Sequence, residues 1–251
     1  MPTIPSSYII ETVIKMYKNV LFDLDGTLLP MDTKYFVDLF TESFCESLVP
    51  VTNTEARTLM NAVWTSVGNM MRNVGGCLNS EVFWHTMNSI CGRDMRPFND
   101  SFDDFYRTDF DAARAATGTQ PLSRACIEWI RNNGGRIILA TNPVFPKSAT
   151  FRRIEWAGLD PRDFEYITTY DNSSACKPHL RYYSEICSAC GIRPEESLMV
   201  GNDTREDMAA AQLGMDTYLI TDCLINRDNK PLSLFRHGSF EDFYGFLRER
   251  G

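Results

Sequence analysis

Hydrophobic and polar residues follow different patterns in different parts of this chain. Residues 20–24 are Val-Leu-Phe-Asp-Leu, a short apolar run typical of a strand that is buried on both faces. From about residue 32 to residue 117, apolar residues recur three and four positions apart, as at Phe36, Phe40 and Phe44. This spacing places them on one side of a helix, so we expect an all-helical block here.

After residue 120, strand-like and helix-like segments alternate. Short runs rich in Val, Ile, Leu and Tyr predict strands at residues 136–141, 166–170, 197–201 and 217–221. Segments that end in glycine predict helices at residues 123–132, 147–157, 179–190 and 205–213. This alternation is typical of a parallel sheet whose strands are connected by crossover helices.

The order of these elements predicts the domain organisation. One strand precedes the helical block and the others follow it, so the block is an insertion within one α/β unit. We expect a doubly wound, Rossmann-like parallel-sheet core formed by residues 16–31 and 118–251, with an all-α insertion formed by residues 32–117. Residues 1–15 precede the first strand and are expected to be a poorly packed extension.

The composition narrows the class of protein. The chain has 251 residues, of which 43% are hydrophobic and 23% charged, as in ordinary globular proteins. Its formal net charge of −8 argues against binding to nucleic acid or to an anionic membrane. No apolar run approaches the roughly 20 residues that span a bilayer, and the first residues lack a secretory-signal pattern. We therefore expect a cytoplasmic protein, a monomer or homodimer, whose eight cysteines are reduced.

Two carboxylates follow the first predicted strand. Asp23 and Asp25 occupy alternate positions, so their side chains are expected to point the same way, and Gly26-Thr27 then predicts a turn. Two like charges side by side are costly unless a cation or a shared proton neutralises them. The stretch therefore predicts a strand that ends in an anionic site, the alternative being an acidic surface turn.

Polar side chains also follow the later strands. In doubly wound sheets, ligands bind at the carboxyl ends of the strands. The residues expected there are Thr141, Asn142, Lys177, Asp203 and Asp207. Carboxylates that converge from several strands favour Mg²⁺, which prefers oxygen ligands and substrate phosphate. The lysine and the hydroxyl group indicate that an anion is held opposite the metal.

This ordered set of motifs resembles the haloacid dehalogenase superfamily. Its four motifs correspond here to "DLDGT", "LATN", "CKP" and "GNDTRED", in that order. The resemblance extends from about residue 18 to residue 222. It implies a Mg²⁺-dependent phosphohydrolase that acts on a small phosphorylated metabolite through an aspartyl-phosphate intermediate.

The resemblance also implies a role for each matching residue. Asp23 would be the nucleophile that attacks phosphorus, and Asp25 the general acid and base. The metal would be bound by the carboxylate of Asp23, the backbone carbonyl of Asp25 and the carboxylate of Asp203. The remaining assignments are phosphoryl binding by Thr141 and the backbone amide of Asn142, charge neutralisation by Lys177, and an indirect role through water or Lys177 for Asp207.

The fourth motif departs from the family pattern at one position. The family usually has Gly-Asp, whereas this chain has Gly201-Asn202-Asp203. We expect Asp203 to be the metal ligand, because it keeps the four-residue spacing to Asp207. If Asn202 occupies that position instead, metal binding would be weaker.

In the resembling family, a helical insertion after the first motif is a cap that covers the site and selects the substrate. Candidate substrate contacts in this block lie near Gly75-Gly76 and are Arg72, Asn73, Trp84 and His85. The alternative roles are helix packing for Trp84 and an ordinary surface or core-edge position for His85.

Other functions remain open from the sequence. A phosphomutase would use the same phosphorylated Asp23, and a binding module could keep the fold without catalysis. A dehalogenase is disfavoured, because those relatives lack the second acidic residue and Asp25 is present.

Overall fold

A parallel sheet of six strands forms the centre of the protein, in a computed structural model that describes residues 17–250. The strand order is β3-β2-β1-β4-β5-β6, and every pair is parallel. The strands are β1 (Asn19–Phe22), β2 (Arg136–Leu139), β3 (Tyr166–Ile167), β4 (Ser197–Gly201), β5 (Asp216–Ile220) and β6 (His237–Gly238). The expected α/β fold with a doubly wound parallel sheet is confirmed.

Helices cover both faces of this sheet. They are α1 (Thr33–Thr52), α2 (Ala56–Met71), α3 (Asn79–Cys91), α4 (Asn99–Arg107), α5 (Ser123–Asn132), α6 (Lys147–Trp156), α7 (Leu180–Cys190) and α8 (Phe240–Arg248). The short 3₁₀ helices are η1 (Arg96–Phe98), η2 (Asp109–Ala116), η3 (Pro161–Asp163), η4 (Pro194–Glu196), η5 (Asp207–Leu213) and η6 (Leu232–Leu234).

Alternate residues of β1 pack on opposite layers, as the period of a strand requires. Leu21 belongs to an apolar cluster with side chains of α7 and η5. Val20 and Phe22 belong to a second cluster, which includes side chains of α5 and α8. This burial on both faces explains the continuous apolar run in the sequence.

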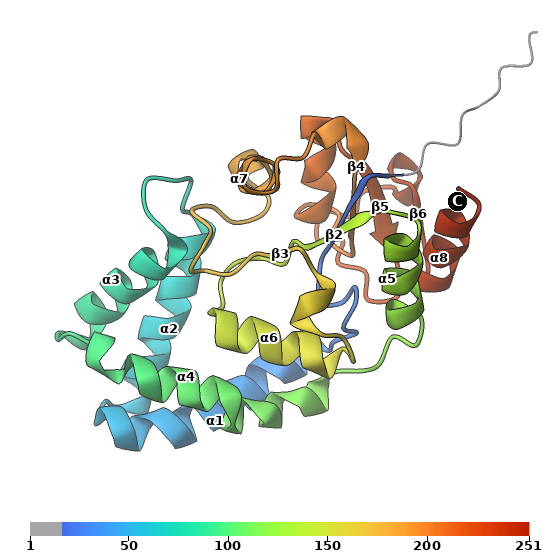
Figure 1. The fold of residues 1–251 in the computed structure, drawn as a ribbon. Helices are drawn as coiled ribbons and strands as arrows, with labels where there is room; N and C mark the ends of the chain where they lie inside the picture. The colour runs from blue at the N-terminus through green and yellow to red at the C-terminus, as the bar shows by residue number, and fades with distance from the viewer. Residues whose placement is uncertain (1–16, 251) are drawn as a thin grey trace, which may run out of the picture.

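The helices α1 to α4 lie between β1 and β2 in the chain and gather at one side of the molecule (Figure 1). The two connections to them lie side by side: Asp32 N–H donates to Ala116 O, and Gly118 N–H donates to Pro30 O. Aromatic contacts join this helical block to the core, for example Phe110 with Trp156 at a centroid distance of 4.8 Å. The block and the core therefore share one continuous apolar cluster.

The structure differs from the sequence-based expectations at several elements. The segment expected as a helix at residues 205–213 becomes helical only at Asp207 and is a 3₁₀ helix. The reason is local: Asp203 Oδ1 accepts the N–H groups of Arg205 and Glu206 and holds them in a turn. Strand β6 and helix α8 lie beyond the last predicted strand. The proposed extension, residues 1–15, lies outside the described residues.

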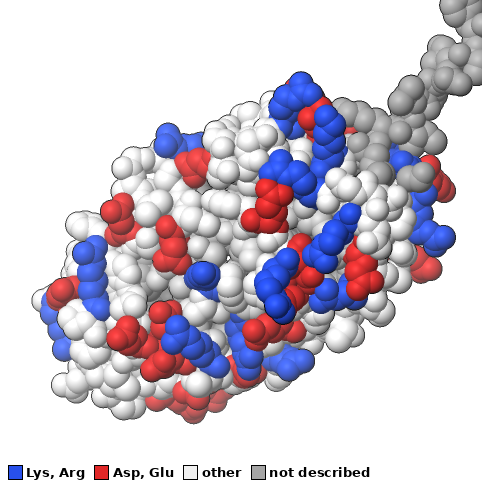
Figure 2. Space-filling view, viewed as in Figure 1, with Lys and Arg blue, Asp and Glu red and all other residues white. Residues whose placement is uncertain are grey.

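Two surface properties bear on function. Within residues 17–250, no helix combines the length and the hydrophobicity needed to cross a membrane. On the face shown in Figure 2, basic and acidic side chains are interspersed rather than gathered by sign.

Candidate active site

Three neighbouring strands end level with one another and bring the sequence motifs together. In the sheet register, Phe22 is opposite Leu139 on one side and opposite Val200 on the other. The pairing continues past the strands, because Asp23 N–H donates to Val200 O over 2.9 Å. Beyond these ends lies a pocket of about 220 Å³, lined by Asp23, Asp25, Thr141, Asn142, Asn202, Asp203, Glu206, Asp207 and side chains of the helical block.

Gly26 is required by the turn that follows Asp25. Its φ angle is +83°, in the left-handed region that glycine adopts without strain. A Cβ atom there would lie only 2.1 Å from Nδ2 of Asn202. The turn is held by the N–H of Thr27, which donates to Leu24 O over 3.1 Å. The Gly-Thr turn signal in the sequence therefore corresponds to a close approach between the first and fourth motifs.

Lys177 connects two buried carboxylates. Its Nζ donates to Asp23 Oδ1 over 2.8 Å and to Asp207 Oδ1 over 2.6 Å. Burial raises the pKa of both carboxyl groups, and the charge of Lys177 opposes that rise. Burial alone would lower the pKa of Lys177, but Asp207 and Asp23 outweigh it and raise that pKa well above its ordinary value. The two carboxylates therefore favour the charged form of the lysine.

Asp25 pairs with Arg153, a residue of α6 that sequence reasoning missed. Arg153 Nη1 donates to Asp25 Oδ2, and the arginine side chain is 1% exposed. Asp25 Oδ1 is buried and has no hydrogen-bond partner among the described residues. A signal existed in the sequence: Arg153 follows Ala149 and Thr150 on the buried side of α6. A basic residue on a buried helix face requires an acidic partner.

The two candidate metal ligands of the fourth motif differ in their contacts. Both polar atoms of the Asn202 side chain are hydrogen-bonded: Nδ2 donates to Cys223 O over 2.6 Å, and Oδ1 accepts from Thr27 over 3.4 Å. Asp203 Oδ2 accepts from Arg227 Nη1 over 2.9 Å, and the arginine side chain is 58% exposed. Oδ2 of Asp203 is therefore held only by a side chain that can move into solvent.

Glu206 is a second functional candidate that the sequence reading passed over. It lines the pocket and accepts a hydrogen bond from Asn142 Nδ2 over 3.0 Å. Burial raises its pKa; the charge of Lys177 opposes this rise, and Asp203 and Asp207 add to it. The signal available in the sequence was the position of Glu206 between Asp203 and Asp207, two residues of the fourth motif.

The second-motif residues are held by the core. Thr141 is buried, and its carbonyl accepts hydrogen bonds from the hydroxyl groups of Thr168 and Tyr182. Asn142 Oδ1 is buried without a partner among the described residues. Both residues line the pocket, although Asn142 Nδ2 is already donated to Glu206.

The helical block contributes a different set of residues from the one expected. Its side chains at the pocket come from Met31 and from α1 and α2: Thr33, Phe36, Val37 and Trp64. The four expected contacts, Arg72, Asn73, Trp84 and His85, do not line this pocket.

The contacts of those four residues explain why they are absent from the pocket. Trp84 is 8% exposed and packs on Phe83 and Phe102. His85 is exposed on α3. Arg72 Nη2 donates to Asn69, and Asn73 Nδ2 donates to Asn79.

The charges around the pocket suit a divalent cation. Five carboxylates line it: Asp23, Asp25, Asp203, Glu206 and Asp207. The basic side chains that pair with them in the described residues are Lys177, Arg153 and Arg227. By formal charge the group is negative by two, and its oxygen donors are of the kind that Mg²⁺ prefers.

The metal-binding capacity depends on more than carboxylates. Within residues 17–250, no three His, Cys, Asp or Glu side chains are placed to hold a metal ion by themselves. Mg²⁺ sites commonly use one or two carboxylates and keep several waters. The donor set of Asp23, Asp203 and the backbone at Asp25 fits that description.

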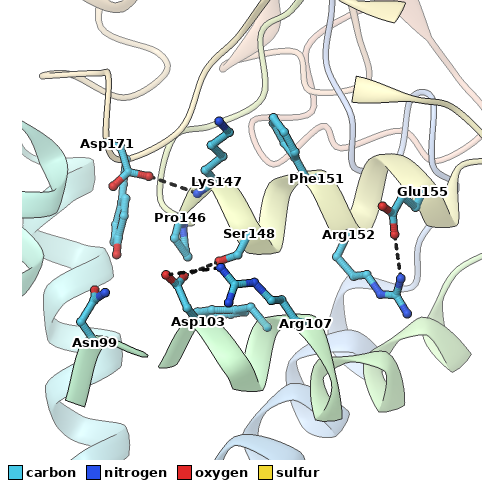
Figure 3. A pocket seen from close by; sticks show the side chains of 12 residues that line it. Asn99, Asp103, Arg107, Pro146, Lys147, Ser148, Phe151, Arg152, Glu155 and Asp171 are labelled. Atoms are coloured by element: carbon cyan, nitrogen blue, oxygen red, sulfur yellow. Dashed lines mark hydrogen bonds and ion pairs between the residues drawn. The ribbon is translucent and has the colours of Figure 1, made fainter. Parts of the chain in front are cut away.

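A second, larger pocket lies away from these residues. It measures about 610 Å³ and is bordered by α4, α6 and the segment after β3 (Figure 3). Ser148 donates to Asp103 across it over 2.8 Å, and Lys147 N–H donates to Asp171 over 3.1 Å. None of the residues of the four motifs lines it. We therefore place the candidate active site at the strand ends.

Known proteins match this chain over most of its length. A family model described as haloacid dehalogenase-like hydrolase matches residues 17–214. The glyceraldehyde 3-phosphate phosphatase of Methanothermobacter thermautotrophicus is 24% identical over 210 residues, which are 82% of this chain and 86% of that protein.

Solved structures share the fold. A HAD phosphatase from Thermococcus onnurineus superposes with a TM-score of 0.56 at 19% identity, covering 92% of this chain and 97% of that one. The HAD-hydrolase YfnB of Bacillus subtilis, solved with bound magnesium, superposes with a TM-score of 0.56 at 17% identity, covering 93% and 100%. With the family match and the four motifs at one sheet edge, the resemblance found in the sequence is confirmed: this chain belongs to the haloacid dehalogenase-like hydrolase family.

Proposed function

We propose that this protein is a Mg²⁺-dependent phosphohydrolase that uses Asp23 as its nucleophile and acts on a small phosphorylated metabolite. The observation that carries the proposal is the contact of Lys177 Nζ with Asp23 Oδ1, at 2.8 Å, at the carboxyl edge of the sheet. A buried carboxylate beside a lysine ammonium group can approach an anionic phosphoryl group with less repulsion. The family match and the relatives described as phosphatases support the same chemistry.

The proposed reaction has two steps. A carboxylate oxygen of Asp23 forms a bond to phosphorus while the bond from phosphorus to the leaving oxygen breaks. The leaving oxygen keeps the electron pair and takes a proton from Asp25. In the second step, water gives a proton to Asp25 and attacks phosphorus. The bond to Asp23 then breaks, which releases inorganic phosphate and restores the carboxylate.

Three other groups prepare the site for these steps. Thr141 and Asn142 line the pocket, and the Thr141 hydroxyl group and the backbone N–H of Asn142 would donate to phosphoryl oxygens. Asp207 holds Lys177, and its Oδ2 accepts the N–H of Asp203 over 2.9 Å. This network orients the lysine before a substrate arrives.

Mg²⁺ would be held by Asp23, the backbone carbonyl of Asp25 and Asp203. When bound, the ion offsets the negative charge of the phosphoryl group and of the nucleophile. We assign the fourth-motif ligand to Asp203 because Asn202 is already engaged by Cys223 and Thr27. The surplus of negative charge around the pocket supports a cation at this place.

The helical block of residues 32–117 would act as a cap. Phe36, Val37 and Trp64 border the pocket from this block, and Phe145 borders it from the core. These apolar side chains would exclude water from the reacting groups. A pocket of about 220 Å³ suits a small phosphorylated metabolite better than a phosphoprotein. We also propose a cytoplasmic location, which the eight free cysteines support.

The test is hydrolysis of p-nitrophenyl phosphate by the wild type with Mg²⁺, by the wild type with EDTA, and by Asp23→Asn. The variant keeps the shape of the side chain but removes the nucleophilic charge. We expect loss of at least about 10³-fold in kcat for Asp23→Asn, with no loss of folded structure. A wild type that is inactive on this compound, acetyl phosphate and a panel of metabolite monophosphates at saturating Mg²⁺ would overturn the proposal. Turnover that requires a bisphosphate activator would favour a phosphomutase.

A further inference from the structure

Arg153 is a buried cation next to the proposed acid and base. Its guanidinium pairs with Asp25 and stands 4.4 Å from the centroid of the Phe145 ring. The Nε and Nη2 atoms of the arginine are buried and have no hydrogen-bond partner among the described residues. Of its three donor nitrogens, only the one that faces Asp25 is therefore paired within residues 17–250.

Such an arrangement would contribute little to the stability of the fold. A buried arginine is costly unless its donors are satisfied, and one pair rarely repays the loss of hydration. Arg124, by comparison, is 41% exposed and still donates to both Asp163 and Gly158. A buried group left partly unsatisfied is more often explained by function.

The pair has a direct consequence for Asp25. Arg153 holds Oδ2, so the carboxylate cannot turn freely about its bonds. Oδ1 is itself buried and has no hydrogen-bond partner among the described residues, while the Asp25 side chain as a whole is 33% exposed and lines the pocket. A carboxylate fixed by a buried cation keeps a constant orientation toward the pocket, which proton transfer to a leaving group requires.

We propose that Arg153 is a positioning residue that orients Asp25 for proton transfer to the leaving oxygen. This inference rests on the proposed phosphohydrolase function. It assigns a role in catalysis to α6, which carries none of the four motifs. Arg153 itself does not line the pocket and acts through Asp25.

The inference makes a prediction about the leaving group. Phenyl phosphate and p-nitrophenyl phosphate have similar shapes, but p-nitrophenolate leaves readily without a proton and phenolate does not. A general acid contributes about 10²- to 10⁴-fold where it is needed. Loss of Arg153 should therefore slow phenyl phosphate hydrolysis much more than p-nitrophenyl phosphate hydrolysis.

The experiment measures kcat/KM for both compounds, because this quantity reports the steps up to phosphoryl transfer. For Arg153→Met we expect a loss at least about 10-fold greater with phenyl phosphate than with p-nitrophenyl phosphate. The conservative Arg153→Lys should recover part of that difference. The matched control is Arg152→Met: Arg152 is the preceding residue of α6 but pairs with Glu155 and Asp111 at the border of the other pocket (Figure 3). We expect it to keep the wild-type ratio.

Two further measurements keep the inference falsifiable. If Arg153→Met unfolds, the loss of kcat/KM with each of the two compounds can be compared in Arg153→Lys and Arg153→Gln instead. When Asp25 is already replaced by Asn, adding Arg153→Met should not change the difference between the two compounds any further, because Arg153 acts by orienting Asp25. An equal loss with both compounds in a folded variant would overturn the inference while leaving the phosphohydrolase proposal intact. A wild type that hydrolyses no phosphate ester would instead overturn the proposed function.

Discussion

The ammonium nitrogen of Lys177 lies 2.8 Å from Oδ1 of Asp23, although the two residues are 154 positions apart in the chain. The same nitrogen lies 2.6 Å from Asp207, and the lysine side chain is 1% exposed. This contact joins the loop after β1 to the segment before α7 and to the start of η5. It therefore contributes both to the proposed chemistry and to the stability of the strand ends.

Replacing Lys177 with Met should affect activity and stability together. Two buried carboxylates would lose their shared cation, and breaking a buried pair costs about 3–5 kcal/mol in free energy of unfolding. Phosphatase activity should fall at least about 10²-fold. Urea unfolding and a phosphatase assay measure the two effects. Lys147→Met, at an exposed position, is the control and should change the free energy of unfolding by less than about 0.5 kcal/mol. A Lys177→Met protein as stable as the wild type would contradict the prediction.

The identity of the metal ligand can be tested with a pair of variants. Asp203→Asn removes the carboxylate that we assign to the ion, and it should raise the Mg²⁺ concentration for half-maximal activity at least about 10-fold. Asn202→Asp should have a smaller effect, because the Asn202 amide is engaged by Cys223 and Thr27. Activity is titrated with Mg²⁺ for each protein. If Asp203→Asn needs no more Mg²⁺ and Asn202→Asp needs less, then position 202 is the ligand position.

Trp64, and not the residues near Gly75-Gly76, should affect substrate selection. Trp64 lines the pocket although 40% of its surface is exposed. Trp64→Ala should change kcat/KM by at least about 5-fold for the best substrate in a panel, because an aromatic contact to the leaving group is lost. His85→Ala, on the exposed side of α3, should change it by less than about 2-fold. Equal effects of the two variants would count against the assignment of the cap contacts.

Asp163 should control the stability of the protein in acid. Its side chain is 8% exposed and pairs with Arg124 at 2.7 Å and Arg131 at 3.1 Å. Burial alone would raise its pKa, but the N–H of Asp160 and the two guanidinium groups outweigh burial and lower it below the ordinary value of 3.8. A depressed carboxyl pKa adds stability above the ordinary value, and this stability is lost as the pH falls through the folded-state value.

Asp163→Asn therefore has a pH-dependent effect. At about pH 7 it should lower the free energy of unfolding by about 1–3 kcal/mol. The difference from the wild type should shrink as the pH falls below about 3.8, where the carboxylate of the unfolded wild type is protonated. Urea unfolding at a series of pH values measures this difference, with Asp228→Asn, at an exposed site, as the control. A difference that stays constant down to about pH 3 would show that the charge of Asp163 is not responsible.

Much of the fold and part of the candidate site could be predicted from the sequence. Strand and helix patterns depend on neighbours in the chain, so they predicted the parallel sheet and the place of the helical block. The motifs could be assigned to one edge because the carboxyl ends of parallel strands meet there. Asp23, Thr141 and Asp203 follow three strands whose register makes them neighbours. Strand β6 was missed because His237 and Gly238 lack the apolar and β-branched side chains that indicate a strand.

Only the tertiary structure decided which other side chains reach the site. Arg153 meets Asp25 across 128 positions, and Asn142 meets Glu206 across 64. Such contacts depend on how α6 and the loop after β4 pack against the sheet, and no local pattern encodes that packing. The same reason applies to the helical block of residues 32–117. Sequence periodicity identified its helices, whereas the packing of these helices against one another, with Trp64 on Phe40 and Trp84 on Phe102, placed Trp64, and not Trp84, at the pocket.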